Sequence, residues 1–442
     1  MAGSVVTSVN RRTRAHWLAL CAMVTAWGMA GMQARAQSTG QSLDEQYAYY
    51  LTGKCQNLGF TRGPNNVVVP GQAGPALAAF CSGPPITGGS SATSSLGGGA
   101  TAEEISNTGG EEDEALKRRR GRLRDSDSDQ TPAADSGQDA ELASFGATSI
   151  FASFDALRER QTATEFEDGR HSTGYDGLLG MDRRFGAKAV AGIAFRYTEQ
   201  SGTFNSGGNF SVHAPGVSVY GSWLPVDGLF LDGAVGFDHR GLDTQRVVAL
   251  KVLTYGAPGY PPNVSYNPAP ASADSNTHEQ DLGAELHIGY DFSLGSLAIG
   301  PRASVTFAHS DLDPYTESGA TPMTLAVNEQ TRTSLRSQLG FQVTNAFKLP
   351  TGVLVPQFNA EWLHEYRDPQ QLLSAHFAED LRPDPVELHF LNNPPDRDWF
   401  VVRLAAVVVF PRGFSAFAAL ERTAGNLYIQ RAQATLGIRM EL

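Results

Sequence analysis

Two histidines that lie near acidic residues are the candidates for catalysis in this chain. His309 precedes Asp311 and Asp313, and His364 precedes Glu365 and Asp368. A carboxylate can orient an imidazole as a general base, but both groups lie where an expected strand meets a loop, and such pairs are usually solvated. The sequence also lacks the G-x-S-x-G, HExxH and GDS-type blocks of common hydrolases. We therefore predict no catalytic residues, no cofactor and no enzymatic activity.

Three alternating acids resemble the start of a calcium-binding loop. Asp125, Asp127 and Asp129 have the spacing, but Gln130 stands where the loop needs glycine, and no glutamate closes it at the twelfth position. The segment is better interpreted as a solvated linker, and no metal site is predicted.

The N-terminus has the pattern of a secretory signal. Arg11, Arg12 and Arg14 form a basic region, residues 17–32 form a mostly apolar run, and Ala34-Arg35-Ala36 fits a cleavage site. The alternative is an N-terminal membrane anchor, but the run is short for a span. We expect residues 1–36 to be a signal peptide.

Export has a consequence for the cysteines. Cleavage removes Cys21 and leaves Cys55 and Cys81 in an oxidising compartment, so these two are predicted to form a disulfide. A formal net charge of −12 makes nucleic acid an unsuitable partner.

Residues 37–147 are expected to be a short passenger and linker segment. Residues 37–84 hold both cysteines and would form a small disulfide unit, whereas 85–147 are a low-complexity linker too polar to order itself. Within this linker, Glu111–Arg124 places acids first and bases last, which favours a helix. Its basic end, Lys117–Arg124, could be a surface patch or could belong to a helix in a barrel lumen.

From residue 148 to 442 the pattern changes to alternation with period two, which predicts β-strands. In 282–292, for example, Leu282, Leu286 and Ile288 share one face while Glu285 and His287 share the other. Beyond the signal there is no apolar run of 18 residues, but a barrel strand needs only about 9–11. Twelve strands are expected, at 148–165, 170–185, 187–200, 210–224, 229–243, 278–292, 297–311, 331–347, 353–367, 398–410, 414–422 and 430–442.

The connections between these strands predict how the sheet is arranged. Links after even-numbered strands are short, whereas three links after odd-numbered strands are long and rich in turn formers: 244–277, 312–330 and 368–397. An even strand number with short turns on one side is typical of an outer-membrane barrel, whose ends then lie on the periplasmic side. The predicted fold is all-β, a 12-stranded antiparallel transmembrane β-barrel with a largely irregular N-terminal segment.

The polar face of the expected strands carries charges of both signs. A soluble sandwich or lipocalin-like barrel would bury its apolar face and could not seal so many charges in its core, whereas a wet lumen can hold them. The charges expected to face the lumen are Arg196, Asp232, Glu285, Arg302, Arg336, Glu361, Arg403 and Glu421.

Several stretches, in this order, resemble the autotransporter β-domain family. They include GLLGMDRRF at 177–185, AGIAFRYTEQSGTF at 191–204, VYGSW at 219–223, GYDF at 289–292, EWLHEY at 361–366 and TLGIRMEL at 435–442. The resemblance covers about 170–442 well. It implies a twelve-stranded barrel linked to export of an N-terminal passenger, with a helix threaded through the pore. Two features depart from the family: the chain ends in Leu442 rather than an aromatic residue, and 37–147 is too short for a β-helical passenger.

The last strand is predicted to carry the assembly signal. Its residues are Thr435, Gly437, Met440 and Leu442, and we expect the insertion machinery to recognise them by pairing with the edge of this strand. The expected partners are the outer-membrane lipid bilayer, the barrel insertion machinery and periplasmic chaperones. The leading hypothesis is a type V secretion barrel that displays its own short N-terminal segment at the cell surface. The alternatives are a pore or scaffold barrel whose N-terminal segment plugs it or stays periplasmic, and an enzyme at the rim.

Overall fold

The computed structural model describes residues 50–51, 55–82, 90–94, 140–145, 148–164, 166–186, 188–254, 264–266, 271–367, 369–410 and 414–440. The predicted signal peptide, the Glu111–Arg124 helix, the acids at 125–129 and Leu442 lie outside these residues.

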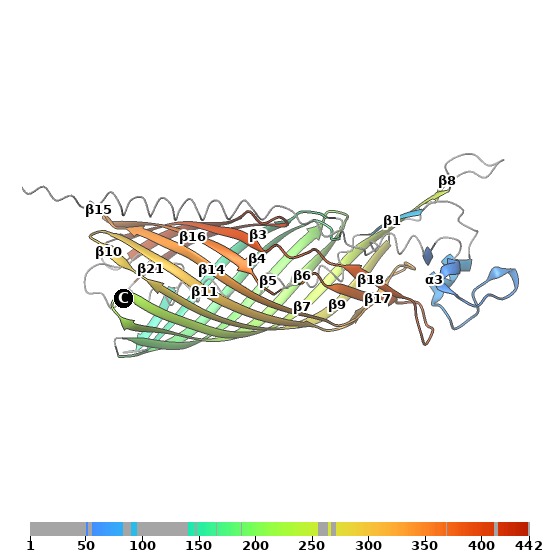
Figure 1. Ribbon diagram of the computed structural model, residues 1–442, viewed down its shortest axis with the longest axis horizontal. Coiled ribbons are helices and arrows are strands. Elements are labelled where there is room, and N and C mark those ends of the chain that lie inside the picture. The colour runs from blue at the N-terminus through green and yellow to red at the C-terminus, as the bar shows by residue number, and fades with distance from the viewer. Residues whose placement is uncertain are drawn as a thin grey trace, which may run out of the picture. The chain divides into compact units, whose positions relative to one another are not determined.

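Twelve of the described strands form a closed antiparallel barrel, as predicted (Figure 1). Each pairs with the next strand along the ring, and the ring closes where Ile429–Ala434 of the last strand pairs with Ala156–Gln161 of the first. The strands are β3 (Thr148–Gln161), β4 (Arg170–Phe185), β5 (Ala189–Phe204), β6 (Gly208–Val226), β7 (Leu229–Thr254), β9 (Ala271–Tyr290), β11 (Leu297–Leu312), β14 (Gln330–Asn345), β16 (Gly352–Glu365), β19 (Asp398–Phe410), β20 (Phe414–Ala424) and β21 (Ile429–Met440).

Tight turns connect the strands at one end of the barrel, which we call the turn end. The short strands β10 (Phe292–Leu294) and β15 (Phe347–Leu349) extend two of these hairpins. Gly228, between β6 and β7, has φ of +79°, and a Cβ there would lie 2.8 Å from the Asp291 carbonyl oxygen. Only glycine fits both the left-handed backbone and this close approach.

The opposite end, which we call the loop end, is more ordered than the sequence predicted. The expectation of an irregular link over 244–277 was wrong at both its ends, because β7 continues to Thr254 and β9 begins at Ala271, pairing through Val248↔Ala271. The β-branched run after Thr244 favours strand, and the turn formers of this link occupy only its middle.

The other two long links contribute a second sheet of four strands. Its strands are β12 (Tyr315–Thr316), β13 (Leu325–Val327), β17 (Leu372–Phe377) and β18 (Glu387–Leu391), in that order. The prediction of plain loops over 312–330 and 368–397 was therefore wrong. Strands of two to six residues between prolines are too short to show alternation in sequence.

The described N-terminal residues form short elements. These are η1 (Gln56–Leu58), η2 (Pro64–Asn66), α3 (Pro75–Ser82), β1 (Ser90–Ser94), β2 (Ala140–Phe145) and, in the β7–β9 link, β8 (Val264–Tyr266). No helix among the described residues is long and apolar enough to cross a membrane.

The burial pattern of the barrel is the inverse of that of a water-soluble protein. Large apolar side chains such as Leu179, Phe195, Val235, Leu286 and Leu404 are exposed on the outer face. Residues of the opposite parity are buried inside, and many are polar or charged, including Asp155, Asp232, Arg240, Glu285 and Arg336. A continuous apolar outer surface of this kind must be covered by lipid rather than water.

Closure of the ring predicts resistance to detergent denaturation, because every strand pair is internal and no edge can fray. Unboiled protein in detergent should migrate differently from boiled protein on a gel. A chain that ends at Ala424 and lacks β21 is the matched control, since it cannot close and should migrate identically in both states. Identical migration of the full chain would contradict the closed barrel.

Candidate functional site

The lumen holds charged side chains that pair with side chains of other strands, either the adjacent strand or, across Gly216 of β6, the next one. Arg196 of β5 forms an ion pair with Asp238 of β7. Asp232 accepts a hydrogen bond from Ser222 Oγ at 2.6 Å and lies 3.7 Å from His287 Nδ1. Arg196 and Asp232 thus have partners on other strands, which lowers the cost of holding these charges away from bulk water.

The remaining predicted lumen charges lie on the same inner face. Arg302 Nη2 donates to Asp291 Oδ1 at 2.6 Å, and its guanidinium lies 4.6 Å from the centre of the Phe230 ring. Arg336 is buried, 5.9 Å from the centre of the Trp399 ring. Glu285 is buried and Glu361 partly buried, while Arg403 lies opposite Glu421 in the β19–β20 register.

Sequence reasoning missed several charges of this face. Arg170 Nη2 lies 3.3 Å from Glu159 Oε1, and Arg240 Nε lies 2.6 Å from Asp281 Oδ2, with all four side chains nearly inaccessible. Their position in the period-two pattern was the available signal. Asp281 lies on the same face of β9 as Glu285, and Arg240 lies on the same face of β7 as Asp232.

His309 and His364 lie on the outer face near the loop end, and Asp368 lies outside the described residues. His309 Nε2 lies 3.3 Å from Asp311 Oδ2. His364 Nδ1 lies 2.9 Å from Asp398 Oδ1 on β19, and Glu365 points to the other side, where it accepts from Ser334 Oγ at 2.5 Å. Adjacent strand residues face opposite ways, so the sequence neighbour was the wrong partner for His364.

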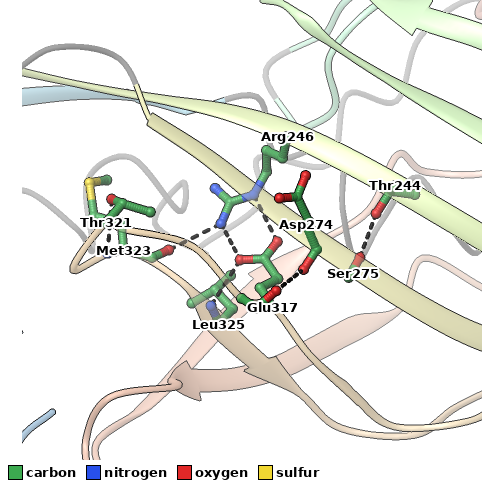
Figure 2. Close-up of polar contacts among 9 residues, drawn as sticks. Thr244, Arg246, Asp274, Ser275, Glu317, Thr321, Met323 and Leu325 are labelled. Carbon is green, nitrogen blue, oxygen red and sulfur yellow. Dashed lines mark hydrogen bonds and ion pairs between the residues drawn. The ribbon is translucent and has the colours of Figure 1, made fainter. Parts of the chain in front are cut away.

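The loop end is held by a buried ion pair between barrel and loop (Figure 2). Arg246 of β7 donates from Nε to Glu317 Oε1 at 2.9 Å and from Nη2 to Glu317 Oε2 at 2.5 Å. Nη2 also donates to the Met323 carbonyl at 3.1 Å, and Glu317 Oε2 accepts from the Leu325 N–H at 2.9 Å. Two backbone hydrogen bonds of 2.8 Å between Asp274 and Ser318 add to this anchor.

An apolar core covers the loop end. Phe204, Phe210, Leu242 and other inward residues at the ends of the barrel strands pack in one buried cluster with the four-stranded sheet. The N-terminal residues Leu51, Cys55, Leu58, Phe60, Val68, Leu77 and Cys81 belong to the same cluster. Barrel, loops and N-terminal unit therefore share one hydrophobic core.

A disulfide closes the N-terminal unit, which we define as residues 50–82. Cys55 and Cys81 are bonded, with Cα atoms 5.3 Å apart, and both are fully buried. Backbone hydrogen bonds join the unit to the β17–β18 link: the Gly74 N–H donates to the Glu379 carbonyl at 2.8 Å, and the Leu381 N–H donates to the Gln72 carbonyl at 3.0 Å.

The two halves of the final strand have different pairing partners. Ile429–Ala434 pair with β3, and Ala432–Ala434 also pair with β20, whereas Thr435, Gly437 and Met440 pair with β20 at Ala419, Phe417 and Phe414. Beside them, the turn-end half of β3 pairs with β2 through Ala140↔Ala152 and Phe145↔Thr148.

A closed ring with an apolar outer face and a charged lumen defines a transmembrane β-barrel. The sequence model of the Autotransporter beta-domain family matches residues 150–421, more than half of the chain. The structure is similar to the translocator domain of the autotransporter NalP from Neisseria meningitidis, with a TM-score of 0.51 and 14% identity over 78% of this chain and 98% of that one.

Two further autotransporter structures are similar. The β domain of the Bordetella autotransporter BrkA has a TM-score of 0.41 and 17% identity, over 65% of this chain and 98% of that one. The transport unit of AIDA-I from Escherichia coli has a TM-score of 0.38 and 12% identity, over 74% and 98%. A comparison with curated proteins found no significant match. The chain belongs to the autotransporter β-domain family, and its barrel is an outer-membrane barrel.

The Arg246–Glu317 pair predicts a local effect of mutation at the loop end. Arg246→Ala or Glu317→Ala leaves the partner charge buried and uncompensated, a change that costs about 3–5 kcal/mol in comparable buried pairs. We expect each variant to become sensitive to protease cleavage within 313–329 while the barrel stays heat-modifiable.

The double variant Arg246→Met/Glu317→Leu tests the reason for that effect. It removes both charges and keeps apolar volume, so it should be cleaved less readily than either single variant. Equal sensitivity of the double and single variants would show that the ion pair does not hold this loop.

Proposed function

We propose that this barrel translocates its own N-terminal segment and displays it at the cell surface. The carrying observation is the position of the N-terminal elements: β1 pairs with Val248–Val252 at the loop end of β7, and the 50–82 unit packs in the loop-end core. Because short turns lie on the periplasmic side of outer-membrane barrels, the loop end is the extracellular end.

Chain connectivity supports a route through the lumen. Ser94 lies in β1 at the loop end, whereas β2, which begins at Ala140, pairs with β3 at the turn end. The chain between them has to pass from one end of the barrel to the other. At about 3.3 Å per extended residue, residues 95–139 can span the barrel, and the charged lumen is the polar path.

Surface labelling of intact cells tests display. An epitope tag after Gln37 should be labelled on whole cells and removed by external protease. A tag between Asp227 and Gly228 at the turn end is the matched control and should be labelled only after the outer membrane is permeabilised. If the Gln37 tag also needs permeabilisation, the segment is periplasmic and the scaffold or plug function replaces display.

We also propose that Thr435, Gly437, Met440 and Leu442 form the signal through which periplasmic chaperones and the insertion machinery recognise the unfolded barrel. Recognition through a strand edge requires a strand that can pair with another protein. The placement of β2 beside β3 supports a role beyond closure, because Ile429–Ala434 already close the ring.

Deletion of 435–442 should therefore abolish outer-membrane insertion. Leu442→Asp should leave little protein in the outer membrane, and Leu442→Phe should match or exceed the wild-type level, because an aromatic end completes the family pattern. Quantification of barrel in the outer-membrane fraction, with heat-modifiability as the folding control, provides the measurement. Near-normal insertion of the deletion variant would contradict this signal.

A further inference from the structure

We propose that the displayed 50–82 unit is not released but is held on its own barrel, and that residues Glu379–Arg382 of the β17–β18 link form the binding site that completes its fold. We call these four residues the docking segment. The proposal rests on the proposed display for its location outside the cell, but the binding itself can be measured independently.

The unit is too small to build a core by itself. It spans 33 residues (50–82), and chains below about 40 residues usually need disulfides or a partner to fold. The named elements among its described residues are the eight-residue helix α3 and two short 3-10 turns. The apolar residues it buries share a cluster with Phe377, Leu388 and Phe390 of the second sheet, so the second sheet supplies the rest of its core.

Glu379 supplies the cap that helix α3 needs. The first N–H groups of a helix have no partner within it, and a carboxylate there also interacts favourably with the helix dipole. Glu379 Oε2 accepts from the Leu77 N–H, the third residue of α3, at 2.5 Å. The Glu379 carbonyl accepts from the Gly74 N–H, one residue before the helix begins. A single residue of the barrel therefore caps the helix of the exported unit.

Arg382 holds the opposite side of the unit. Its Nη1 donates to the Leu58 carbonyl at 2.5 Å, and its guanidinium lies 4.5 Å from the centre of the Phe60 ring. Asp380 fixes the guanidinium through Nε at 2.8 Å and Nη2 at 2.5 Å. The hydrogen bond that Arg382 donates to the Asp380 carboxylate raises the pKa of Arg382 above its ordinary value. The arginine is thus oriented before it meets the unit, which reduces the entropy lost on binding.

The backbone of the unit is shaped for this contact. Between the Glu379 and Arg382 contacts, Ala73 and Asp380 form an isolated β-bridge. At Gly74 the fit is close: a Cβ there would lie 2.9 Å from Cγ and Cδ of Glu379. At Gly63, in contrast, the nearest atom to a Cβ would be the Val67 carbonyl oxygen at 3.9 Å, and its φ of −88° suits alanine. Gly63→Ala is therefore a matched control for Gly74→Ala.

Cleavage between the unit and the barrel tests retention. A site for a specific protease is inserted between Gly88 and Gly89 of the full chain, with the epitope tag after Gln37, so that β1 stays with the barrel. Protease is added to intact cells and, separately, to purified protein in detergent. For the wild type and for Gly63→Ala we expect the cleaved tagged fragment to remain with the cells and to co-elute with the barrel.

Gly74→Ala, Glu379→Ala and Arg382→Ala should each raise the ratio of released to retained fragment about tenfold or more, since each disturbs a charge-assisted contact. Arg367→Ala, which changes an exposed arginine in the link before β17, should not. Heat-modifiability should be unchanged in all variants, and Cys55 and Cys81, fully buried in the docked unit, should become accessible to reductant only in those that release.

The outcomes separate the two proposals. Complete release of the wild-type fragment from cells and in detergent overturns retention and leaves display intact. Retention in all variants overturns the docking segment as the binding site. Cleavage that occurs only in detergent or permeabilised cells, with the fragment retained, contradicts display and supports the docking contact.

Discussion

Pairing of the last strand with the first is the constraint on which the rest of the structure depends. Once Ile429–Ala434 pair with Ala156–Gln161, every strand of the ring has two neighbours and its backbone hydrogen bonds are internal. Only then can the outer face lie in lipid, where an unpaired backbone group is costly. Closure also divides the side chains into two sets, one exposed to lipid and one enclosed. The alternation of apolar and polar residues along each strand therefore matches these two environments.

Enclosure holds the lumen charges away from bulk water, which is costly unless they are paired. The register of the strands brings acids and bases close enough to pair. Because residues opposite each other on antiparallel strands have Cβ atoms about 4.5–5.5 Å apart, acids and bases on adjacent strands can meet if their parity agrees. Arg240 with Asp281 and Arg170 with Glu159 meet diagonally, each two residues from direct register, which long side chains can span, and their side chains are almost completely buried. The inner face is charged at these positions and apolar at others, such as the clusters around Leu178 and Val190 and around Val355 and Val407.

Alternation and turn spacing were sufficient to predict the twelve strands, because both properties are local. The four-stranded sheet was missed because β12 and β13 have only two and three residues, too few to show a repeated period-two pattern. The contact of Leu77 with Glu379 spans 302 residues and has no local signal. His364 shows the same limit on a smaller scale, since its partner Asp398 is set by the β16–β19 register rather than by sequence neighbours.

Burial of apolar residues in the core at the loop end favours movement of the N-terminal segment toward that end in the proposed translocation. Each large apolar side chain of the N-terminal unit gains about 1.5–3 kcal/mol when it is buried, and Leu58, Phe60 and Leu77 are buried only in the shared loop-end core. A segment that reaches the loop end would therefore be trapped there by the burial of its own apolar residues, by the cap from Glu379 and by the Cys55–Cys81 bond. On this argument, folding outside the lumen opposes backward movement without any external energy source, and the second sheet supplies part of the core in which the unit is buried.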